Sequence, residues 1–373
     1  MFSYEMPSKI VFGKGSVNGL GAAADAFGAD KVLVFSGGAS AEVSGVLLEV
    51  ERALVGRKIR VFRGIRPDPE VSSLNAGLKL CREFAPGMVV SAGGGSVIDY
   101  GKAVAAISSS GEDAGDVFRK KRLDRPGTIP FVAIPTTFGT SSEITPYAVM
   151  TDKASGIKVT LADGSMFPAR AYIDPLFTLT MPRPLVAASC CDLLSHAVEA
   201  YWNRNATPIT DCLAIEAVKR FMSCYEDVCG TPPAPEAMER ICVAGMFAGM
   251  AFSNTRTTAS HSISYPLTVG FGIPHGVACM LTLGEMLLFN AKEESGKIRV
   301  LCDVMGCPGP EEAREMITMI MTGLGVKTRL SEYGITPGDI EYILDRGFTP
   351  ERMLNNPVHV SRDDLRSILE RIF

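Results

Sequence analysis

Short apolar runs recur through the first half of the chain, with longer helix-like stretches between them. The runs are rich in β-branched residues and read KIVFG at 9–13, KVLVFS at 31–36, VVSAGGGS at 89–96, FVAIPTT at 131–137 and AYIDP at 171–175. Strands that alternate with helix-length segments are typical of βαβ units, whose strands lie parallel in one sheet. The pattern therefore predicts an α/β domain with a mostly parallel sheet.

Strand-like runs stop after Pro182, and apolar residues then recur with helical spacing. Such helical periods cover residues 186–202, 209–225, 235–252 and 277–289. Turn signals at Asp174-Pro175 and Met181-Pro182 mark the change. At roughly 150 residues per domain, a chain of 373 residues is expected to form about two domains. We predict an α/β domain over residues 1–178 and an all-α domain over residues 179–373.

Charge content indicates which partners the protein can bind, and cysteine content indicates the cellular compartment. The chain has 37 Lys and Arg against 41 Asp and Glu, a net charge of −4, so it lacks the basic surface that nucleic acid or an anionic membrane requires. Its ten cysteines form no CxxC pair, and its first ten residues, MFSYEMPSKI, contain no apolar signal segment. These features predict a cytoplasmic protein with reduced thiols.

Three of the four histidines fall in one window of 80 residues, 196–275, and two of them, His261 and His275, lie in a segment almost free of charge from Thr257 to Gly284. Prolines and glycines interrupt this segment, so we interpret it as buried core around a site and not as a membrane span. Asp192 and His196 are four residues apart, a spacing that puts both side chains on one face of a helix. His261 and His275 are fourteen apart, which suits a helix followed by a returning loop.

One carboxylate and three imidazoles make a donor set that Fe(II), Zn(II) or a similar divalent ion can use. The alternative for Asp192 and His196 is an ordinary surface ion pair between residues one helical turn apart. A buried imidazole in apolar surroundings needs a partner to offset its lost hydration, and this favours the metal site.

Two turns after predicted strands have the chemistry to bind a dinucleotide. Gly93-Gly94-Gly95-Ser96 precedes a helix, where glycines and free N–H groups can approach a pyrophosphate. The segment IPTTFGTSSE at 134–143 offers a row of hydroxyls to phosphate or ribose. The alternatives are a tight turn without a ligand and a Ser/Thr-rich helix cap. After the run at 31–36, Gly37-Gly38-Ala39-Ser40 carries no carboxylate for a ribose hydroxyl, which predicts a preference for NADPH or use of both nicotinamide cofactors.

Taken together, GGGSVIDYGKA, IPTTFGTSSE, the Asp192/His196 helix and His261 followed by PHG resemble the iron-containing (group III) alcohol dehydrogenase family over nearly the whole chain. The resemblance implies a Rossmann-like dinucleotide-binding domain followed by an all-helical domain, a two-domain architecture like that of dehydroquinate synthase. It also implies oxidation of alcohols or reduction of aldehydes, and assembly as a homodimer or larger homo-oligomer.

Family site residues can be carried over by motif. The metal ligands fall on Asp192, His196, His261 and His275. The cofactor contacts fall on glycines, hydroxyls and two charged residues, namely Gly94, Gly95, Ser96, Asp99, Thr136, Thr137, Thr140 and Lys158, together with Gly37, Gly38 and Ser40 of the turn that selects between NAD and NADP. Gly37 stands where NAD-selective members have an aspartate, as in members that use NADPH.

Two departures from the family pattern bear on the reaction. Many members have a second histidine four residues after the first metal histidine of this segment; here that position is Tyr265. A proton relay would therefore use the tyrosine hydroxyl, or a ribose hydroxyl and water. Members commonly have glycine at the position of Arg256, whose guanidinium could clamp an anionic substrate group beside the metal or form a structural ion pair.

A branch of the family that reduces phosphonoacetaldehyde has a run similar to one in this chain, formed by Glu199, Trp202, Asn205, Thr207 and Pro208. We predict a metal-dependent NAD(P) alcohol dehydrogenase or aldehyde reductase with a small-molecule substrate, in which the ion acts as a Lewis acid. The alternatives are a sugar-phosphate cyclase of the dehydroquinate synthase type and a non-catalytic protein that binds metal or nucleotide.

Overall fold

The computed structural model describes residues 1–125, 127, 129–153, 156–228 and 233–373. Contacts between residues divide the chain into two compact units, residues 6–181 and residues 182–373 together with residues 1–5. The first residues belong to the second unit because the Tyr4 hydroxyl donates to the Met250 carbonyl at 3.2 Å and the Glu5 amide donates to Asn254 Oδ1 at 2.7 Å.

The first unit is built on a parallel sheet of six strands in the order β1-β8-β5-β4-β2-β3. These strands are β1 (Lys9–Phe12), β2 (Lys31–Ser36), β3 (Lys58–Phe62), β4 (Met88–Gly93), β5 (Phe131–Pro135) and β8 (Arg170–Ile173). A separate antiparallel hairpin consists of β6 (Tyr147–Asp152) and β7 (Ile157–Ala162). The predicted parallel sheet is confirmed, while β3 and the hairpin are strands that the sequence pattern did not reveal.

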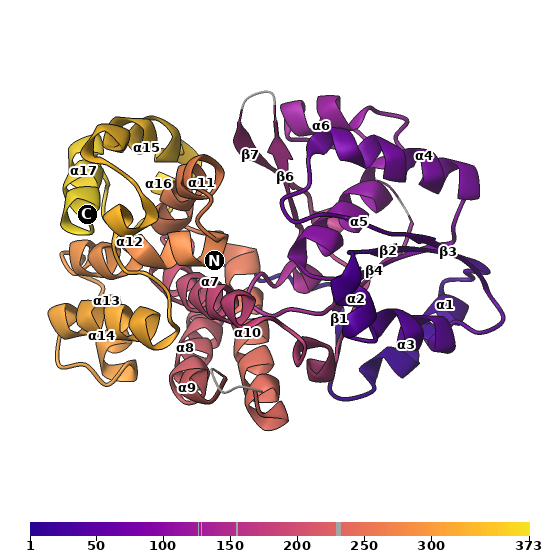
Figure 1. The fold of residues 1–373 in the computed structure, drawn as a ribbon, viewed down its shortest axis with the longest axis horizontal. Helices are drawn as coiled ribbons and strands as arrows, with labels where there is room; N and C mark the ends of the chain where they lie inside the picture. The colour runs from indigo at the N-terminus through magenta and orange to yellow at the C-terminus, as the bar shows by residue number, and fades with distance from the viewer. Residues whose placement is uncertain (126, 128, 154–155, 229–232) are drawn as a thin grey trace. The chain divides into compact units, whose positions relative to one another are not determined.

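Helices cover both faces of this sheet (Figure 1). They are α1 (Leu20–Ala26), α2 (Ala39–Val43), α3 (Val46–Ala53), α4 (Leu74–Phe84), α5 (Gly95–Ile107) and α6 (Ala114–Lys120). Alternate residues of β2 point to opposite faces, so Leu33 and Phe35 pack with α4 to α6 while Val32 and Val34 pack with α1 and α3. The central strands are therefore buried on both sides, as a doubly covered parallel sheet requires.

Among its described residues the second unit contains helices and no strand, as the sequence predicts. Its helices are α7 (Arg183–Trp202), α8 (Pro208–Met222), α9 (Tyr225–Val228), α10 (Pro235–Thr255), α11 (Ala259–Phe271), α12 (His275–Asn290), α13 (Lys297–Val304), α14 (Pro310–Gly323), α15 (Ile340–Gly347), α16 (Pro350–Met353) and α17 (Arg362–Arg371). The start of α8 shows why boundaries fall where they do: the Thr207 hydroxyl accepts from the Thr210 amide, and Pro208 opens the helix without losing a hydrogen bond.

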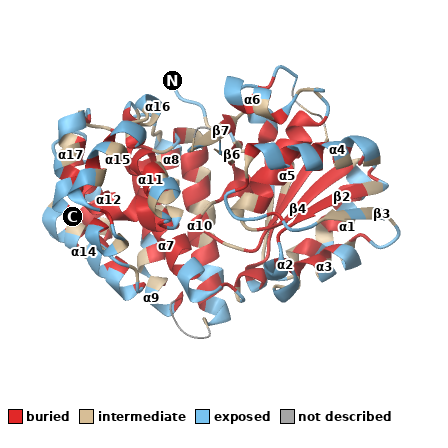
Figure 2. Ribbon diagram, turned by 45° about the horizontal axis from the view of Figure 1, so that its top comes forward, coloured by how far each residue is buried: buried red, intermediate tan, exposed pale blue. Residues whose placement is uncertain are grey.

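Helix α7 lies at the centre of the helical unit and is buried on all sides from Val186 to Trp202 (Figure 2). Polar side chains on such a helix face other protein groups and not water, so each needs a partner. No disulfide forms among the nine described cysteines, and Cys229 lies outside the described residues. Within the described ranges, no helix combines the length and the apolar character needed to cross a membrane.

Candidate metal centre and dinucleotide site

Asp192 and His196 lie on the buried helix α7, each with less than a tenth of its surface exposed. His196 Nδ1 is 3.8 Å from Asp192 Oδ1, and the His196 ring stacks on Phe252. Because both residues are in the interior of the unit, the alternative of a surface ion pair does not hold for them.

Two further imidazoles approach the same carboxylate oxygen. His261 lies in the first turn of α11 and His275 is the first residue of α12, with Gly272 in a left-handed conformation in the turn between them. His261 Nε2 is 3.7 Å from Asp192 Oδ1 and His275 Nε2 is 3.9 Å from it. Ligand atoms bound to one tetrahedral ion stand roughly 3.4 Å apart, so these separations are close to those of a metal site.

Two buried atoms at this point have no hydrogen-bond partner, Asp192 Oδ1 and His261 Nε2. Leaving such an atom unsatisfied costs about 1–3 kcal/mol, more if the group is charged. Burial acts to raise the pKa of Asp192, but the neighbouring imidazoles hold that pKa well below its usual range. An ionised carboxylate and an unpaired imidazole nitrogen facing each other fit a divalent cation.

Glu199, which the ligand prediction did not include, determines the orientation of His261. Its Oε2 contacts His261 Nδ1, and its Oε1 accepts from the Thr258 hydroxyl at 2.5 Å and from the Ser260 amide at 2.8 Å. With Nδ1 occupied, Nε2 is directed to Asp192, an arrangement typical of carboxylate–histidine–metal sites. The sequence feature that could have identified Glu199 is its position seven residues after Asp192, on the same face of α7.

The structure also gathers a residue that the sequence analysis did not select. One potential ligand atom from each of Asp192, His261, His275 and Cys279 lies within 4.8 Å of all the others. His196 adjoins this group through Asp192 and through its ring, whose centroid is 4.4 Å from that of His261. Three of the four predicted ligands thus meet with Cys279, and the fourth lies alongside.

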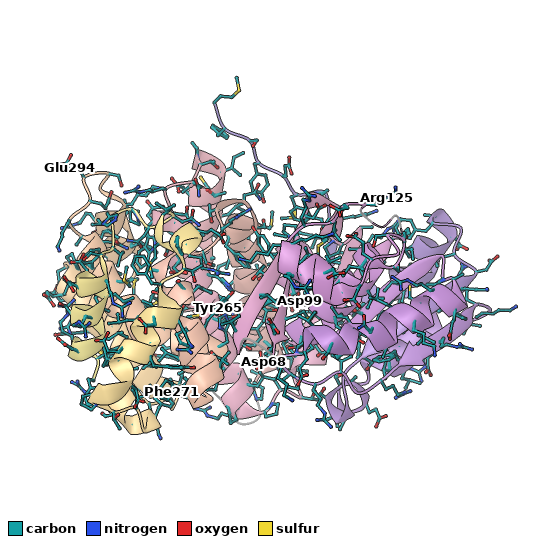
Figure 3. The ribbon with its side chains drawn as sticks, turned by 90° about the horizontal axis from the view of Figure 1, so that it is seen from above. Asp68, Asp99, Arg125, Tyr265, Phe271 and Glu294 are labelled. Atoms are coloured by element: carbon teal, nitrogen blue, oxygen red, sulfur yellow. The ribbon has the colours of Figure 1, made fainter. Side chains whose placement is uncertain are left out.

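Tyr265 lies one turn after His261 on α11, the helix that also carries Phe271 (Figure 3). Its ring centroid is 5.9 Å from that of His275. Arg352 of α16 donates to the Tyr265 hydroxyl at 2.6 Å, and its guanidinium lies 4.6 Å from the ring centroid. Arg352 also donates to the Thr257 hydroxyl at 3.4 Å and has no carboxylate within 4 Å among the residues described. The tyrosine hydroxyl is therefore held in place by an arginine that has no ion-pair partner in this part of the fold.

Arg256 ends helix α10 with φ 65° and ψ −172° and is exposed. This backbone region is populated almost only by glycine, and another residue there costs of the order of 1–3 kcal/mol. Its carbonyl accepts from Asn203 Nδ2 at 3.2 Å and from the Thr255 hydroxyl at 2.9 Å. The described residues place no carboxylate within 4 Å of its guanidinium, so the structural ion pair considered from the sequence is not found there.

In the α/β unit, the predicted cofactor turns follow three neighbouring strands. Gly37 and Gly38 follow β2, Gly94 to Ser96 follow β4, and Thr136 to Thr140 follow β5. Register pairs Ser36 with Ala92 and Gly93 with Pro135, so all three turns leave the same edge of the sheet. Dinucleotides bind at this carboxyl edge in open α/β sheets.

Gly95 of the β4 turn is required by the hydroxyl turn beside it, whereas Gly94 only makes an ordinary contact with that turn. A Cβ on Gly95 would lie 2.8 Å from Thr140 Oγ1, and one on Gly94 would lie 3.4 Å from the methyl carbon of Thr137. Thr136 joins the two turns, since its amide donates to the Gly93 carbonyl at 3.0 Å. Ser40 is exposed in the first turn of α2. The two motifs that appeared separate in the sequence thus form one surface.

Ser96, Asp99 and Lys158 are held by protein partners in this structure. Ser96 Oγ accepts from the Asp68 amide at 3.2 Å, and Lys158 Nζ is 2.8 Å from Asp68 Oδ1. Asp99 accepts from the Val149 amide at 2.9 Å through Oδ2, while its buried Oδ1 has no hydrogen-bond partner and lies 3.6 Å from Lys102 Nζ. Asp68 and Asp99 are both labelled in Figure 3. Asp68 is a further residue that the sequence analysis missed, and it links two predicted cofactor contacts.

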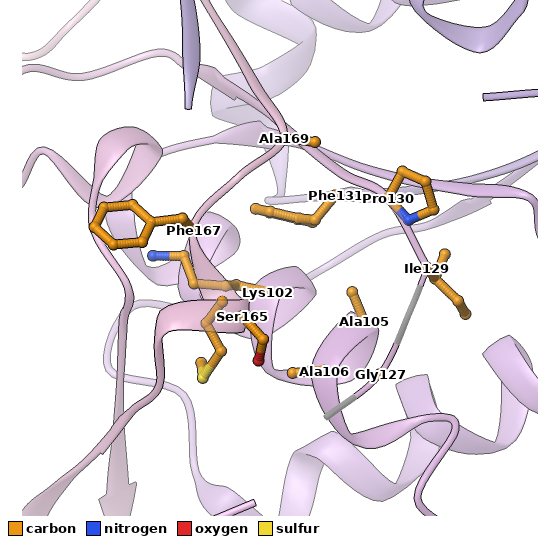
Figure 4. A pocket seen from close by; sticks show the side chains of 11 residues that line it. Lys102, Ala105, Ala106, Gly127, Ile129, Pro130, Phe131, Ser165, Phe167 and Ala169 are labelled. Atoms are coloured by element: carbon orange, nitrogen blue, oxygen red, sulfur yellow. The ribbon is translucent and has the colours of Figure 1, made fainter. Parts of the chain in front are cut away.

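Lys102 is fully buried beneath this surface and organises it. Its Nζ donates to three carbonyls of the segment after β5, those of Ser142, Thr145 and Tyr147, at 2.7 to 2.8 Å. A pocket of about 170 Å³ beside Lys102 is lined mainly by Ala, Pro, Phe and Ile side chains (Figure 4). The Lys102 ammonium already donates to three carbonyls, so its donors are taken up by the protein and not by a ligand in this pocket.

Comparison with known proteins agrees with this geometry. The family model described as iron-containing alcohol dehydrogenase matches residues 7–175, and the model described as the C-terminal part of the Fe-containing alcohol dehydrogenase family matches residues 186–373. The NADPH-dependent butanol dehydrogenase of Clostridium saccharobutylicum is 31% identical over 100% of this chain and 98% of its own length. The 1,3-propanediol dehydrogenase of Klebsiella pneumoniae is 27% identical over 100% of this chain and 99% of its own.

Among solved structures, the sulfoacetaldehyde reductase of Bifidobacterium kashiwanohense in complex with NAD+ aligns with a TM-score of 0.94. It is 30% identical and the alignment covers 100% of this chain and 98% of that one. The two family models together span nearly the whole chain, and both the resemblance inferred from the motifs and the oxidoreductase class are confirmed. The chain therefore belongs to the iron-containing alcohol dehydrogenase family, and it is an oxidoreductase that acts on CH–OH groups.

Proposed function

We propose that this protein interconverts a short anionic aldehyde and its primary alcohol, using NAD(P)(H) and a divalent ion held by Asp192, His196, His261 and His275. The observation that carries the proposal is the convergence of three imidazoles within 3.9 Å of one buried carboxylate oxygen. The similarity to a sulfoacetaldehyde reductase supports an anionic substrate, because sulfonate and phosphonate groups have the same charge-based recognition chemistry.

When bound, the ion supplies Lewis acidity to the substrate oxygen and the nicotinamide supplies or accepts a hydride. Asp192 provides negative charge to hold the ion, and Glu199 fixes His261 in the ring orientation that presents Nε2. The apolar segment from Thr257 to Gly284 keeps water from the centre, since its residues are mostly buried. Either Fe(II) or Zn(II) fits the O and N donors of this proposed set.

Tyr265 is our candidate for moving the substrate proton. Its hydroxyl accepts from Arg352, which leaves the hydroxyl hydrogen available to point elsewhere. In the reducing direction the Tyr265 hydroxyl would donate a proton to the developing alkoxide, and it would regain one from water or a ribose hydroxyl.

For the substrate anion we propose Arg256, with Arg352 as a second cation nearby. Arg256 adjoins Thr257, to which Arg352 donates. Strain held at an exposed arginine points to a function that outweighs its cost in stability. A guanidinium matches two oxygens of a sulfonate or phosphonate at once.

NADPH is our proposed cofactor, with NADH also accepted. Gly37 brings no carboxylate to the turn after β2, and its carbonyl accepts from the Gly64 amide at 3.2 Å. Arg63 precedes Gly64, Arg66 lies two residues after it, and both arginines are exposed. Arg63 is paired with Glu42 at 2.9 Å, so Arg66 is the cation beside this turn that favours a 2′-phosphate. We also propose a cytoplasmic homodimer or larger homo-oligomer, which light scattering on the purified protein tests.

A panel of aldehydes tests the proposed function. Purified protein reconstituted with Fe(II) or Zn(II) is assayed with sulfoacetaldehyde, phosphonoacetaldehyde and butanal, each with NADPH and with NADH. We expect turnover of an anionic aldehyde with kcat/KM at least about tenfold above that for butanal, the difference that one charged hydrogen bond supplies. Equal or better turnover of butanal would remove the anionic specificity, and absence of any metal-dependent turnover across the panel would contradict the proposal.

A further inference from the structure

We propose that the thiolate of Cys279 is a ligand of the ion in this metal centre, an inference that rests on the metal-binding part of the proposed function. Nothing in the sequence motifs assigns Cys279 a role, because it lies outside any CxxC or CxxH pair. Its place is determined by α12, where it follows His275 by four residues and so shares its helical face.

The distances fit a sulfur ligand. Cys279 Sγ is 3.8 Å from His275 Nε2, and sulfur and nitrogen ligands of one tetrahedral zinc ion stand roughly 3.6 Å apart. The same sulfur lies within 4.8 Å of a ligand atom of Asp192 and of His261. Cys279 is fully buried, so its sulfur faces this group and not solvent.

The unpartnered atoms of the centre provide independent support. Asp192 Oδ1 and His261 Nε2 are buried without hydrogen-bond partners, and both belong to the group that contains Cys279. Glu199 occupies the other nitrogen of His261, so Nε2 is the atom that the ring presents to the centre. An ion placed among these atoms would satisfy the carboxylate and the imidazole and would meet the sulfur at the same time.

Ligation by Cys279 has two chemical consequences. The S–H bond breaks as the metal–sulfur bond forms, and the proton leaves to solvent, so uptake of the ion releases one proton more than it would without the thiol. A thiolate is also a softer ligand than carboxylate or imidazole, which shifts the preference of the centre from Fe(II) towards Zn(II). The chain would then differ in its donor set from an all O and N site.

Cobalt(II) is the probe that tests the inference, because thiolate bound to cobalt gives an intense sulfur-to-cobalt charge-transfer band in the near ultraviolet that O and N ligands do not give. Full-length protein freed of metal is loaded with Co(II). We expect this band together with the weaker visible d–d bands. The matched control is Cys302→Ser, a fully buried cysteine on α13, which should keep the band.

In Cys279→Ser we expect the d–d bands to persist and the charge-transfer band to vanish. Zinc affinity is measured by competition with a chromogenic chelator. It should fall at least about tenfold, because even the loss of a residue that only hydrogen-bonds to a ligand lowers metal affinity by that factor. Zinc uptake should also release about one proton fewer, measured by calorimetry in buffers of different ionisation enthalpy.

The wild-type spectrum can overturn the inference even if the variant does not fold. Visible d–d bands without a charge-transfer band would overturn Cys279 as a ligand and leave the proposed function standing. Failure of the wild-type protein to bind cobalt at all would overturn both the inference and the metal-binding part of the proposed function.

Discussion

The backbone of Arg256 holds a conformation that glycine adopts without strain, and this allows function and stability to be separated at one residue. In Arg256→Gly we expect the free energy of unfolding to rise by about 1 kcal/mol or more as the strain is relieved. The same variant should lose roughly 10- to 100-fold in kcat/KM for an anionic aldehyde, because charged hydrogen bonds are removed, and change little for butanal.

Denaturant unfolding and steady-state kinetics measure the two effects of Arg256→Gly side by side. The control is Arg299→Ala. Arg299 is exposed on α13 and pairs with Asp303, so this variant removes a positive charge away from the proposed site and should leave kcat/KM unchanged for both aldehydes. Equal losses for charged and neutral aldehydes would dismiss Arg256 as the anion clamp, whatever happened to stability.

Glu199 acts on the metal centre only through His261, so its removal should lower metal affinity. In Glu199→Gln we expect zinc affinity to fall roughly 10- to 100-fold, as for loss of other outer partners of metal histidines. The comparison is Glu285→Gln, a second buried carboxylate, whose partners are Arg314 and Arg371. Glu285→Gln should lose stability and keep its zinc affinity in a chelator competition assay. Unchanged zinc affinity in Glu199→Gln would show that Glu199 is not needed to orient the His261 ring.

At the scale of elements, the turn after β2 is expected to control the choice of cofactor. A Cβ on Gly37 would have only ordinary contacts, 3.4 Å to Ser40 Oγ and 3.5 Å to Val97 Cγ2, so a side chain fits there. Gly37→Asp should lower kcat/KM for NADPH by roughly 10- to 100-fold through repulsion and lost hydrogen bonds, and should maintain or raise the value for NADH. Gly37→Asn, which adds bulk without charge, should change the ratio less. If both variants affect the two cofactors alike, this turn does not contact the ribose.

The segment after β5 contains the carboxyl group of Glu143, and burial of this group favours its protonated form. Burial raises the pKa of Glu143 to about 7. The charge of Asp99 acts in the same direction, and the charge of Lys102 acts to lower this pKa. Between the usual value near 4.5 and about 7, the folded chain therefore binds more protons at this residue than the unfolded chain. The contribution of Glu143 to stability is accordingly highest below pH 4.5 and falls as pH rises through this window.

Glu143→Gln should remove that dependence. The free energy of unfolding of the variant relative to wild type should rise with pH across the window, by at most about 3 kcal/mol, since each pKa unit corresponds to 1.36 kcal/mol. Urea titrations at several pH values measure this difference in the free energy of unfolding. Parallel curves for Glu143→Gln and wild type would show that the carboxyl is ionised in the fold.

Some elements could be predicted from the sequence and others could not, for physical reasons. The β4 and β5 strands lie in the middle of the sheet, so their residues are apolar on both faces and their runs are plain. β3 reads KIRVF and lies at the edge, where its polar side chains can face water, and the apolar pattern therefore disappears. Asp192 and the histidines were found by helical spacing. Glu199 and Cys279 also share helical faces with Asp192 and His275, but their roles depend on contacts between α7, α11 and α12 that spacing along one helix does not show.

For the whole molecule, the metal centre should stabilise the unit that contains its ligands. Its residues come from α7, α11 and α12, which are far apart in sequence, so an ion bound to all of them links helices that separate on unfolding. Binding to the folded state alone adds about 2.7 kcal/mol at a free zinc concentration 100 times the Kd. For a unit of this size we expect the melting temperature to rise by roughly 5–10 °C.

Scanning calorimetry of metal-free and zinc-loaded protein measures that shift, and hydrogen exchange locates it. Protection should increase in α7, α11 and α12, whereas the amides of the six-stranded sheet should change little because no proposed ligand comes from it. Asp192→Asn keeps the shape of the side chain and removes the charge that attracts the ion, so its melting temperature should not respond to zinc. A shift of the same size in Asp192→Asn would mean that zinc stabilises the protein from another site, and the assignment of this centre would then be wrong.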